Sequence, residues 1–154
     1  MGMKKRKASH MSGSGGCKYT KAAKNGSVDA QFKLGMRYKK GKGVAQDDRK
    51  AAKWFARAAK RGYAPAQNNL GICYARGRGV EEDKSRAVQL YTSAAQQGYV
   101  NAQYNLGMCY YRGSGVEMHE GKAAEWFTKA AEGGYAVSAM SPSGAGEGAS
   151  HLYT

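Results

Sequence analysis

Basic side chains recur at one position of a repeating pattern in this chain. Lys40, Arg76 and Arg112 are spaced 36 residues apart, so a stack of equivalent elements would align three cations. In a packed helical array such cations lie ~10 Å apart, within reach of successive carboxylates on an extended peptide. Alternatively, each cation sits in the last turn of a helix and stabilises its dipole. The two roles are compatible, and both stay open.

Amide and aromatic side chains accompany these cations. Asn69 and Asn105 are also one period apart, and asparagine is a poor residue for a helix interior. We therefore expect them to form hydrogen bonds, either within the repeat or to the backbone of a bound peptide. The positions expected to line one groove are the set Phe32, Asn68, Tyr104, the set Lys39, Ala75, Tyr111 and the three cations. The predicted site consists of Phe32, Lys39, Lys40, Asn68, Asn69, Arg76, Tyr104, Asn105, Tyr111 and Arg112.

Patterns typical of catalysis or metal binding have weaker support. Cys73 and Cys109 are one period apart, beyond the ~7 Å limit for a disulfide, which favours small residues at the edge of a core over a redox pair. The three histidines are scattered and predict no metal site. Glycine-rich segments such as Gly41–Val44 lack the Gly-Lys-Ser/Thr and preceding strand of a phosphate-binding loop. We expect no catalytic residue, cofactor or metal, and hence no enzyme.

The elements that position the predicted site repeat with the same period. The recurring pairs are Ala30-Gln31, Ala66-Gln67 and Ala102-Gln103, followed by Leu34-Gly35, Leu70-Gly71 and Leu106-Gly107. Ala30, Leu34 and Tyr38 fall at four-residue steps, which predicts a first helix over about 28–40. Glycines end this helix, and Asp47 and Asp83 are placed to cap a second one. Each unit therefore is predicted to be a helix hairpin that needs its neighbours to bury its apolar faces.

The pattern Ala-x-x-x-Leu-Gly-x-x-Tyr, Gly-x-Gly-Val-x-x-Asp-x-x-Lys-Ala and Ala-Ala-x-x-Gly resembles the Sel-one-like repeat family, a relative of the tetratricopeptide repeats. The resemblance covers residues 17–140. It implies an all-α, right-handed α-solenoid of helix-turn-helix repeats and a scaffold or adaptor role without catalytic residues. One position departs from the pattern, because His119 replaces the capping aspartate in the third unit. The cap of that helix is therefore in question, although Glu117 and Glu120 lie near its start.

The predicted domain organisation has three parts. Residues 1–16 are expected to form a flexible leader or linker, 17–140 the repeat array, and 141–154 a disordered, Gly/Ser-rich tail. The array would contain the end of a preceding unit, three full units and a fourth that aborts at Pro142, since proline inside a helix costs about 3 kcal/mol. Both ends would lack a polar capping helix, which predicts exposed apolar faces near Tyr19 and Trp126 and possible end-to-end self-association.

The net charge of +14 is concentrated in the N-terminal part of the chain. Residues 1–26 contribute +7 and residues 27–62 contribute +8, whereas the remainder sums to −1. No apolar stretch follows the basic residues at 4–7, so no secretory signal peptide, no membrane span and a reduced, intracellular location are expected. The leading interpretation is a non-catalytic adaptor that binds a protein or peptide, with an acidic segment as one candidate. The alternative is a binder of nucleic acid or another anionic surface through the basic half.

Overall fold

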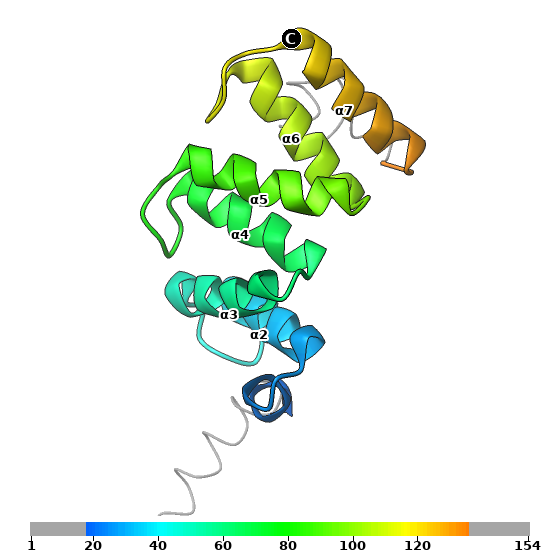
Figure 1. The fold of residues 1–154 in the computed structure, drawn as a ribbon. Helices are drawn as coiled ribbons and strands as arrows, with labels where there is room; N and C mark the ends of the chain where they lie inside the picture. The colour runs from blue at the N-terminus through cyan, green and yellow to red at the C-terminus, as the bar shows by residue number, and fades with distance from the viewer. Residues whose placement is uncertain (1–17, 136–154) are drawn as a thin grey trace, which may run out of the picture.

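The computed structural model describes residues 18–135, and all regular structure in this part of the chain is helical. Residues 18–24 are helical and are followed by six helices of 13 residues. Their bounds are α2 (Val28–Lys40), α3 (Asp48–Lys60), α4 (Ala64–Arg76), α5 (Lys84–Gln96), α6 (Val100–Arg112) and α7 (Glu120–Glu132). The hairpins α2–α3, α4–α5 and α6–α7, here called units 1, 2 and 3, stack in chain order (Figure 1). The predicted all-α solenoid is confirmed.

Two glycines of the loop between the helices of a unit have separate roles. The first ends the first helix, and the second lets the loop pack on the preceding unit. Gly41 ends α2 with a φ of 71° in the left-handed region, and its amide donates to the carbonyl of Arg37. The second glycine of the next loop, Gly79, has a φ of 76°. A Cβ on Gly79 would collide with the backbone carbonyl of Asp48, at the start of α3. The loops of units 2 and 3 thereby hold the start of the second helix in the preceding unit, since Gly115 meets the carbonyl of Lys84 in the same way.

Side chains cap the second helix of every unit. The carboxylates of Asp47 and Asp83 accept hydrogen bonds of 3.0 Å from backbone amides three residues later. In unit 3 the Nδ1 atom of His119 accepts the equivalent bond, also 3.0 Å, from the amide of Lys122. The second helix of unit 3, α7, is therefore capped although a histidine replaces the aspartate. Because Nδ1 accepts this bond, the neutral imidazole of His119 carries its proton on Nε2.

The Leu-Gly pair of each first helix packs its hairpin together. Leu34 is 0% exposed and Leu106 is 1% exposed. The following glycine, Gly35, lets the ring of Phe55 lie against the helix backbone, since a Cβ there would come within 2.7 Å of ring carbons. Gly71 with Tyr91 and Gly107 with Phe127 repeat this packing. The small residue is required because the aromatic ring occupies the space of a side chain.

Buried glutamines connect each unit to the one before it. The side-chain amides of Gln31, Gln67 and Gln103 donate to the carbonyls of Ala23, Ala59 and Ala95 over 3.1, 3.3 and 3.2 Å. These bonds join a first helix to the last turn of the preceding second helix. The stacking that the repeat pattern predicts is thus backed by directional bonds as well as apolar burial.

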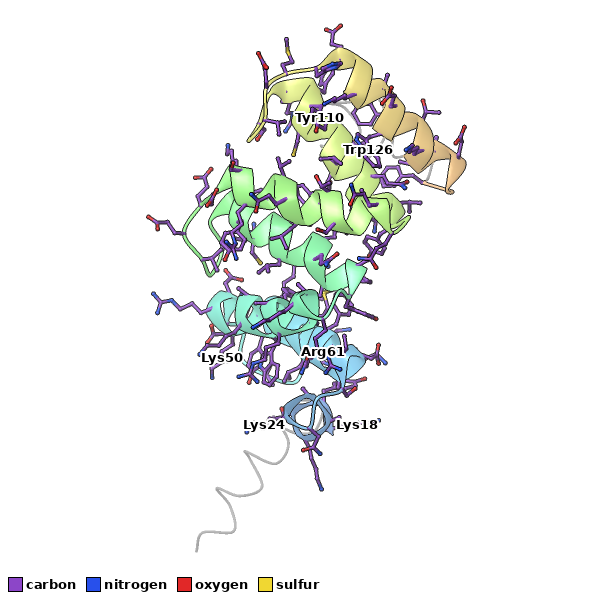
Figure 2. All side chains as sticks on the ribbon, viewed as in Figure 1. Lys18, Lys24, Lys50, Arg61, Tyr110 and Trp126 are labelled. Carbon is purple, nitrogen blue, oxygen red and sulfur yellow. The ribbon has the colours of Figure 1, made fainter. Side chains whose placement is uncertain are left out.

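The bulky residue of each second helix also faces the preceding unit. Leu90 packs on the core formed by α3 and α4, and Trp126 packs on the core formed by α5 and α6. Trp126 lies on α7 (Figure 2). Trp126 is half-buried there and does not form the end face that the sequence predicted around it. Two alanines of α7, Ala124 and Ala131, are exposed instead.

Several sequence predictions fall outside the part that the structure describes. These are the leader at 1–16, the proline break at Pro142 and the tail at 141–154. Within residues 18–135, no helix has both the length and the apolar character needed to span a bilayer. The same residues contain no cluster of three or more His, Cys, Asp or Glu side chains suited to a metal ion.

Candidate functional site

Two cavities open at equivalent places between consecutive units. The first inter-unit cavity, between units 1 and 2, has a volume of about 30 Å³, and the second, between units 2 and 3, about 400 Å³. Eight lining positions of the first recur one period later in the second. The pairs are Lys39/Ala75, Asp48/Lys84, Phe55/Tyr91, Asn69/Asn105, Ile72/Met108, Cys73/Cys109, Arg76/Arg112 and Arg78/Ser114. The chain therefore presents the same structural site twice, with different side chains at five of these eight positions.

The first inter-unit cavity is closed by a lysine. Lys39 Nζ donates to Asn69 Oδ1 over 3.3 Å, and Asn69 Nδ2 donates to the carbonyl of Pro65 over 2.9 Å. Partial burial lowers the pKa of Lys39 from its ordinary value, and the nearby cation of Arg76 acts in the same direction. Asp48 also lines this cavity and offsets part of the positive charge. The site is both filled and partly neutralised from within the chain.

The second inter-unit cavity is open and positive. Ala75 stands where Lys39 fills the first cavity, and Lys84 stands where Asp48 supplies a carboxylate. Arg76, Lys84 and Arg112 line the cavity, and no described acidic residue does. Lys84 forms an exposed ion pair with Glu82 at 3.4 Å, whereas the two arginines form no ion pair within residues 18–135. Two of the differences thus remove the lysine that fills the first site and replace its carboxylate with an amine, and Ser114 in place of Arg78 leaves further space.

Polar side chains on α4 and α6 complete the second inter-unit cavity. Asn105 Nδ2 donates to Oδ1 of the buried Asn68 over 2.9 Å, across the unit boundary. Tyr104 is 3% exposed, and its hydroxyl has no hydrogen-bond partner among the described residues. Burial raises the pKa of Tyr104 to about 12, so the hydroxyl is a neutral donor at physiological pH. Its ring stacks on Tyr135 with centroids 4.6 Å apart.

The thiol in the same cavity is not activated. Burial raises the pKa of Cys109 to about 11, even though Arg112 and Lys84 favour the thiolate. Cys73 in the first inter-unit cavity has its pKa raised by burial as well. Both are free, buried cysteines, as expected for residues at the edge of a core. A protonated thiol is a poor nucleophile, so the arrangement suits binding better than covalent chemistry.

The structure brings the predicted site residues together only in part. The second inter-unit cavity gathers Arg76, Tyr104, Asn105 and Arg112, while Lys39, Asn69 and Arg76 line the first. Asn68 is buried and holds Asn105. Lys40 lies apart from both, in a pocket with Tyr19 and Met36. The three cations therefore do not share one cavity.

The two remaining aromatic residues of the predicted site serve packing. Phe32 is half-buried against the rings of Phe55 and Tyr63, with centroids 5.8 and 5.5 Å away. Tyr111 is half-buried near Phe127, at 6.5 Å. Each ring is thus engaged on one side by its own unit.

Lys84 is the main site residue that the sequence analysis missed. Lys84 lies at the start of α5, a second helix, whereas the predicted site consists of first-helix residues. The sequence did contain a sign of this difference, because the equivalent positions 48, 84 and 120 of the three units are Asp, Lys and Glu. A change of charge sign at one repeat position marks the unit where the site differs.

The stacked hairpins define the class of protein as an α-solenoid of helical repeats with an inter-unit site. The Sel1 repeat model matches residues 28–63, 64–99 and 100–135, and the chain belongs to the Sel1 repeat family. Proteins of this family generally mediate protein–protein interactions and are typically non-catalytic. No curated protein sequence matches the chain significantly.

Three solved structures are similar to this chain. A protective antigen of uropathogenic Escherichia coli, c5321, has 41% identity and a TM-score of 0.74, over 75% of this chain and 25% of its own. A Sel1 repeat protein from Oxalobacter formigenes has 35% identity and a TM-score of 0.68, over 71% and 43%. Cysteine rich protein B of Helicobacter pylori has 25% identity and a TM-score of 0.57, over 71% and 92%. The chain thus spans less than half the length of the first two.

Proposed function

We propose that this chain is a non-catalytic adaptor that binds a protein or peptide segment along the first helices α2, α4 and α6. The observation that carries the proposal is the inter-unit site between successive first helices, which occurs twice and is open in one copy. An extended segment crossing the stack would meet cations, amides and a ring at this site. Charge then steers the encounter, and buried apolar area supplies most of the affinity.

Exposed ion pairs contribute only about 0–1 kcal/mol each, so the rings are expected to matter more than any one cation. This expectation gives the proposal a specific test. A random-peptide display selection on the full chain is expected to enrich binders that lose affinity in a Lys40/Arg76/Arg112→Ala variant. Loss should be greater for Tyr111→Ala than for Lys40→Ala alone. Binding unchanged in the triple variant removes the cations from the site.

A second candidate is a binder of anionic polymers, favoured by the net charge of +15 over residues 1–62. Lys18, Lys24, Lys50 and Arg61 lie in the N-terminal half of the stack (Figure 2). Against it, many exposed cations already lie over rings of the same chain. Lys50, Arg86 and Lys122 lie 5.4, 5.1 and 5.4 Å from the centroids of Tyr38, Tyr74 and Tyr110. Those rings are less accessible for stacking on bases.

Salt dependence separates the two candidates. Nucleic-acid binding falls steeply with salt because phosphate neutralisation releases counterions. We expect weak RNA and DNA binding that is lost in moderate salt and in a variant with residues 4–7 changed to glutamine. RNA binding that persists in moderate salt yet is lost in this variant would favour the second candidate.

A further inference from the structure

The most distinctive unassigned feature is the contrast between the two inter-unit cavities. In the first, Lys39 occupies the space and donates to Asn69, and Asp48 supplies a negative charge. In the second, Ala75 leaves that space empty and Lys84 reverses that charge. In the first inter-unit cavity, side chains of the chain itself therefore occupy the space that is vacant in the second.

The second inter-unit cavity is equipped to receive an acceptor. Arg76 and Arg112 line it and are free of ion pairs within residues 18–135. Tyr104 lines it too, and its buried hydroxyl lacks an acceptor among the described residues. A buried donor without a partner is unfavourable, and arginine pairs well with planar carboxylates. An anionic oxygen ligand would satisfy both kinds of donor.

We propose that the second inter-unit cavity binds a carboxylate of a peptide ligand, held by Arg76, Arg112 and Tyr104. This inference rests on the proposed function and specifies the chemistry of its ligand. The carboxylate belongs either to an Asp or Glu side chain or to the C-terminus of the peptide. Met108 also lines the cavity and offers an apolar contact that a peptide side chain can use and a free inorganic anion cannot.

The test uses three N-acetylated pentapeptides that differ only in their carboxylate. Leu-Ala-Glu-Ala-Leu amide carries a side-chain carboxylate, Leu-Ala-Gln-Ala-Leu free acid carries a terminal one, and Leu-Ala-Gln-Ala-Leu amide carries neither. Each is titrated into the ¹⁵N-labelled full chain while the Nε–H signals of Arg76 and Arg112 are followed by NMR. We expect saturable shifts with at least one acidic peptide and none with the neutral one. The stronger acidic peptide identifies the source of the carboxylate.

A matched pair of variants ties the binding to this cavity. Ala75→Lys/Lys84→Asp installs the lysine and the carboxylate of the first inter-unit cavity and lowers the net charge by one. Lys60→Gln, at an exposed position on α3, lowers the net charge by the same amount. The double variant should bind the acidic peptide at least about tenfold more weakly, and Lys60→Gln should bind it normally.

Tyr104→Phe provides an independent readout. Removal of a hydroxyl without a partner should leave the melting temperature unchanged or higher, yet weaken the acidic peptide about tenfold. Equal binding of all three peptides, or no shift with any of them, overturns the carboxylate assignment. Equal binding still leaves the proposed function standing. Acidic-peptide binding that is retained by Ala75→Lys/Lys84→Asp also overturns the assignment.

Discussion

Single positions of the repeat decide whether an inter-unit site is closed or open. Position 39 of unit 1 carries a lysine whose amine donates to Asn69. Its counterpart Ala75 has no polar side chain and cannot form this bond. Tyr104 replaces the asparagine of unit 2 and adds a buried ring with an unpaired hydroxyl. The smaller side chains Ala75 and Ser114, in place of Lys39 and Arg78, accompany the larger volume of the second inter-unit cavity.

The buried thiol of Cys109 makes stability depend on pH. Burial raises its pKa from 9.0 to about 11, so the unfolded chain loses this proton at lower pH than the folded chain. The stabilisation is complete below pH 9 and is lost as pH rises towards 11. We expect the free energy of unfolding in urea to fall between pH 9 and pH 11, and to fall less in Cys109→Ala. Equal slopes in both proteins would contradict the assigned burial.

At the scale of elements, the loops position the second helices beside the first helices of the next unit. Gly79 packs on the carbonyl of Asp48, and Gly115 packs on that of Lys84. The second contact places the start of α5 beside the end of α6, which brings Lys84 to the cavity of Arg112. The site is therefore a product of loop packing as well as of helix order.

Gly79→Ala tests this loop packing. The substitution combines a left-handed φ with a backbone collision, so we expect a loss of at least ~2 kcal/mol in the free energy of unfolding. Gly62→Ala is the control, because Gly62 has a φ of 85° but no atom within 4 Å of the added Cβ. Gly62→Ala should lose only the part of the free energy of unfolding that comes from the left-handed backbone conformation. Equal losses would argue against the interlock between loop and helix.

The cap of α7 gives a second test at this scale. His119→Ala removes the acceptor for the Lys122 amide and should cost about 1 kcal/mol. His119→Asp restores the cap used by α3 and α5, and should be at least as stable as the parent at neutral pH. Thermal unfolding followed by circular dichroism measures both. A neutral effect of His119→Ala would mean that this hydrogen bond contributes nothing.

The sequence predicted the elements better than the site. The 36-residue period and the glycines placed α2 over 28–40, and the helix in the structure spans Val28–Lys40. The sequence alone could not show that the amine of Lys39 donates to Asn69, because this hydrogen bond joins neighbouring units. Nor did it reveal Lys84, whose place depends on the packing of the loop at Gly115. Relations along one helix are set by periodicity, whereas relations between units need the stack.

At the scale of the whole molecule, the C-terminal end of the described stack, at α7, differs from its interior. Ala52 and Ala59 of unit 1 are 2% and 7% exposed because unit 2 covers them. Their counterparts in α7, Ala124 and Ala131, are exposed. The interior units thus show that the first helix of another unit packs on this face.

We expect end-to-end self-association through this face at high concentration. Light scattering during size-exclusion chromatography should show a mass that rises with concentration. Ala124→Glu/Ala131→Glu should remove the rise, whereas Ala45→Glu/Ala56→Glu, which adds the same charge at other exposed alanines, should not. A strict monomer at every concentration would exclude this association.

The central claim is that a peptide segment binds between the first helices of this Sel1 repeat stack. The most direct measurement is an NMR map of the full chain with the strongest peptide from a display selection. We expect the largest shifts at Arg76, Tyr104, Asn105 and Arg112, with α3 and the outer surface of α7 little affected. Failure to select any peptide, or shifts confined to the second helices away from both inter-unit cavities, would contradict the claim.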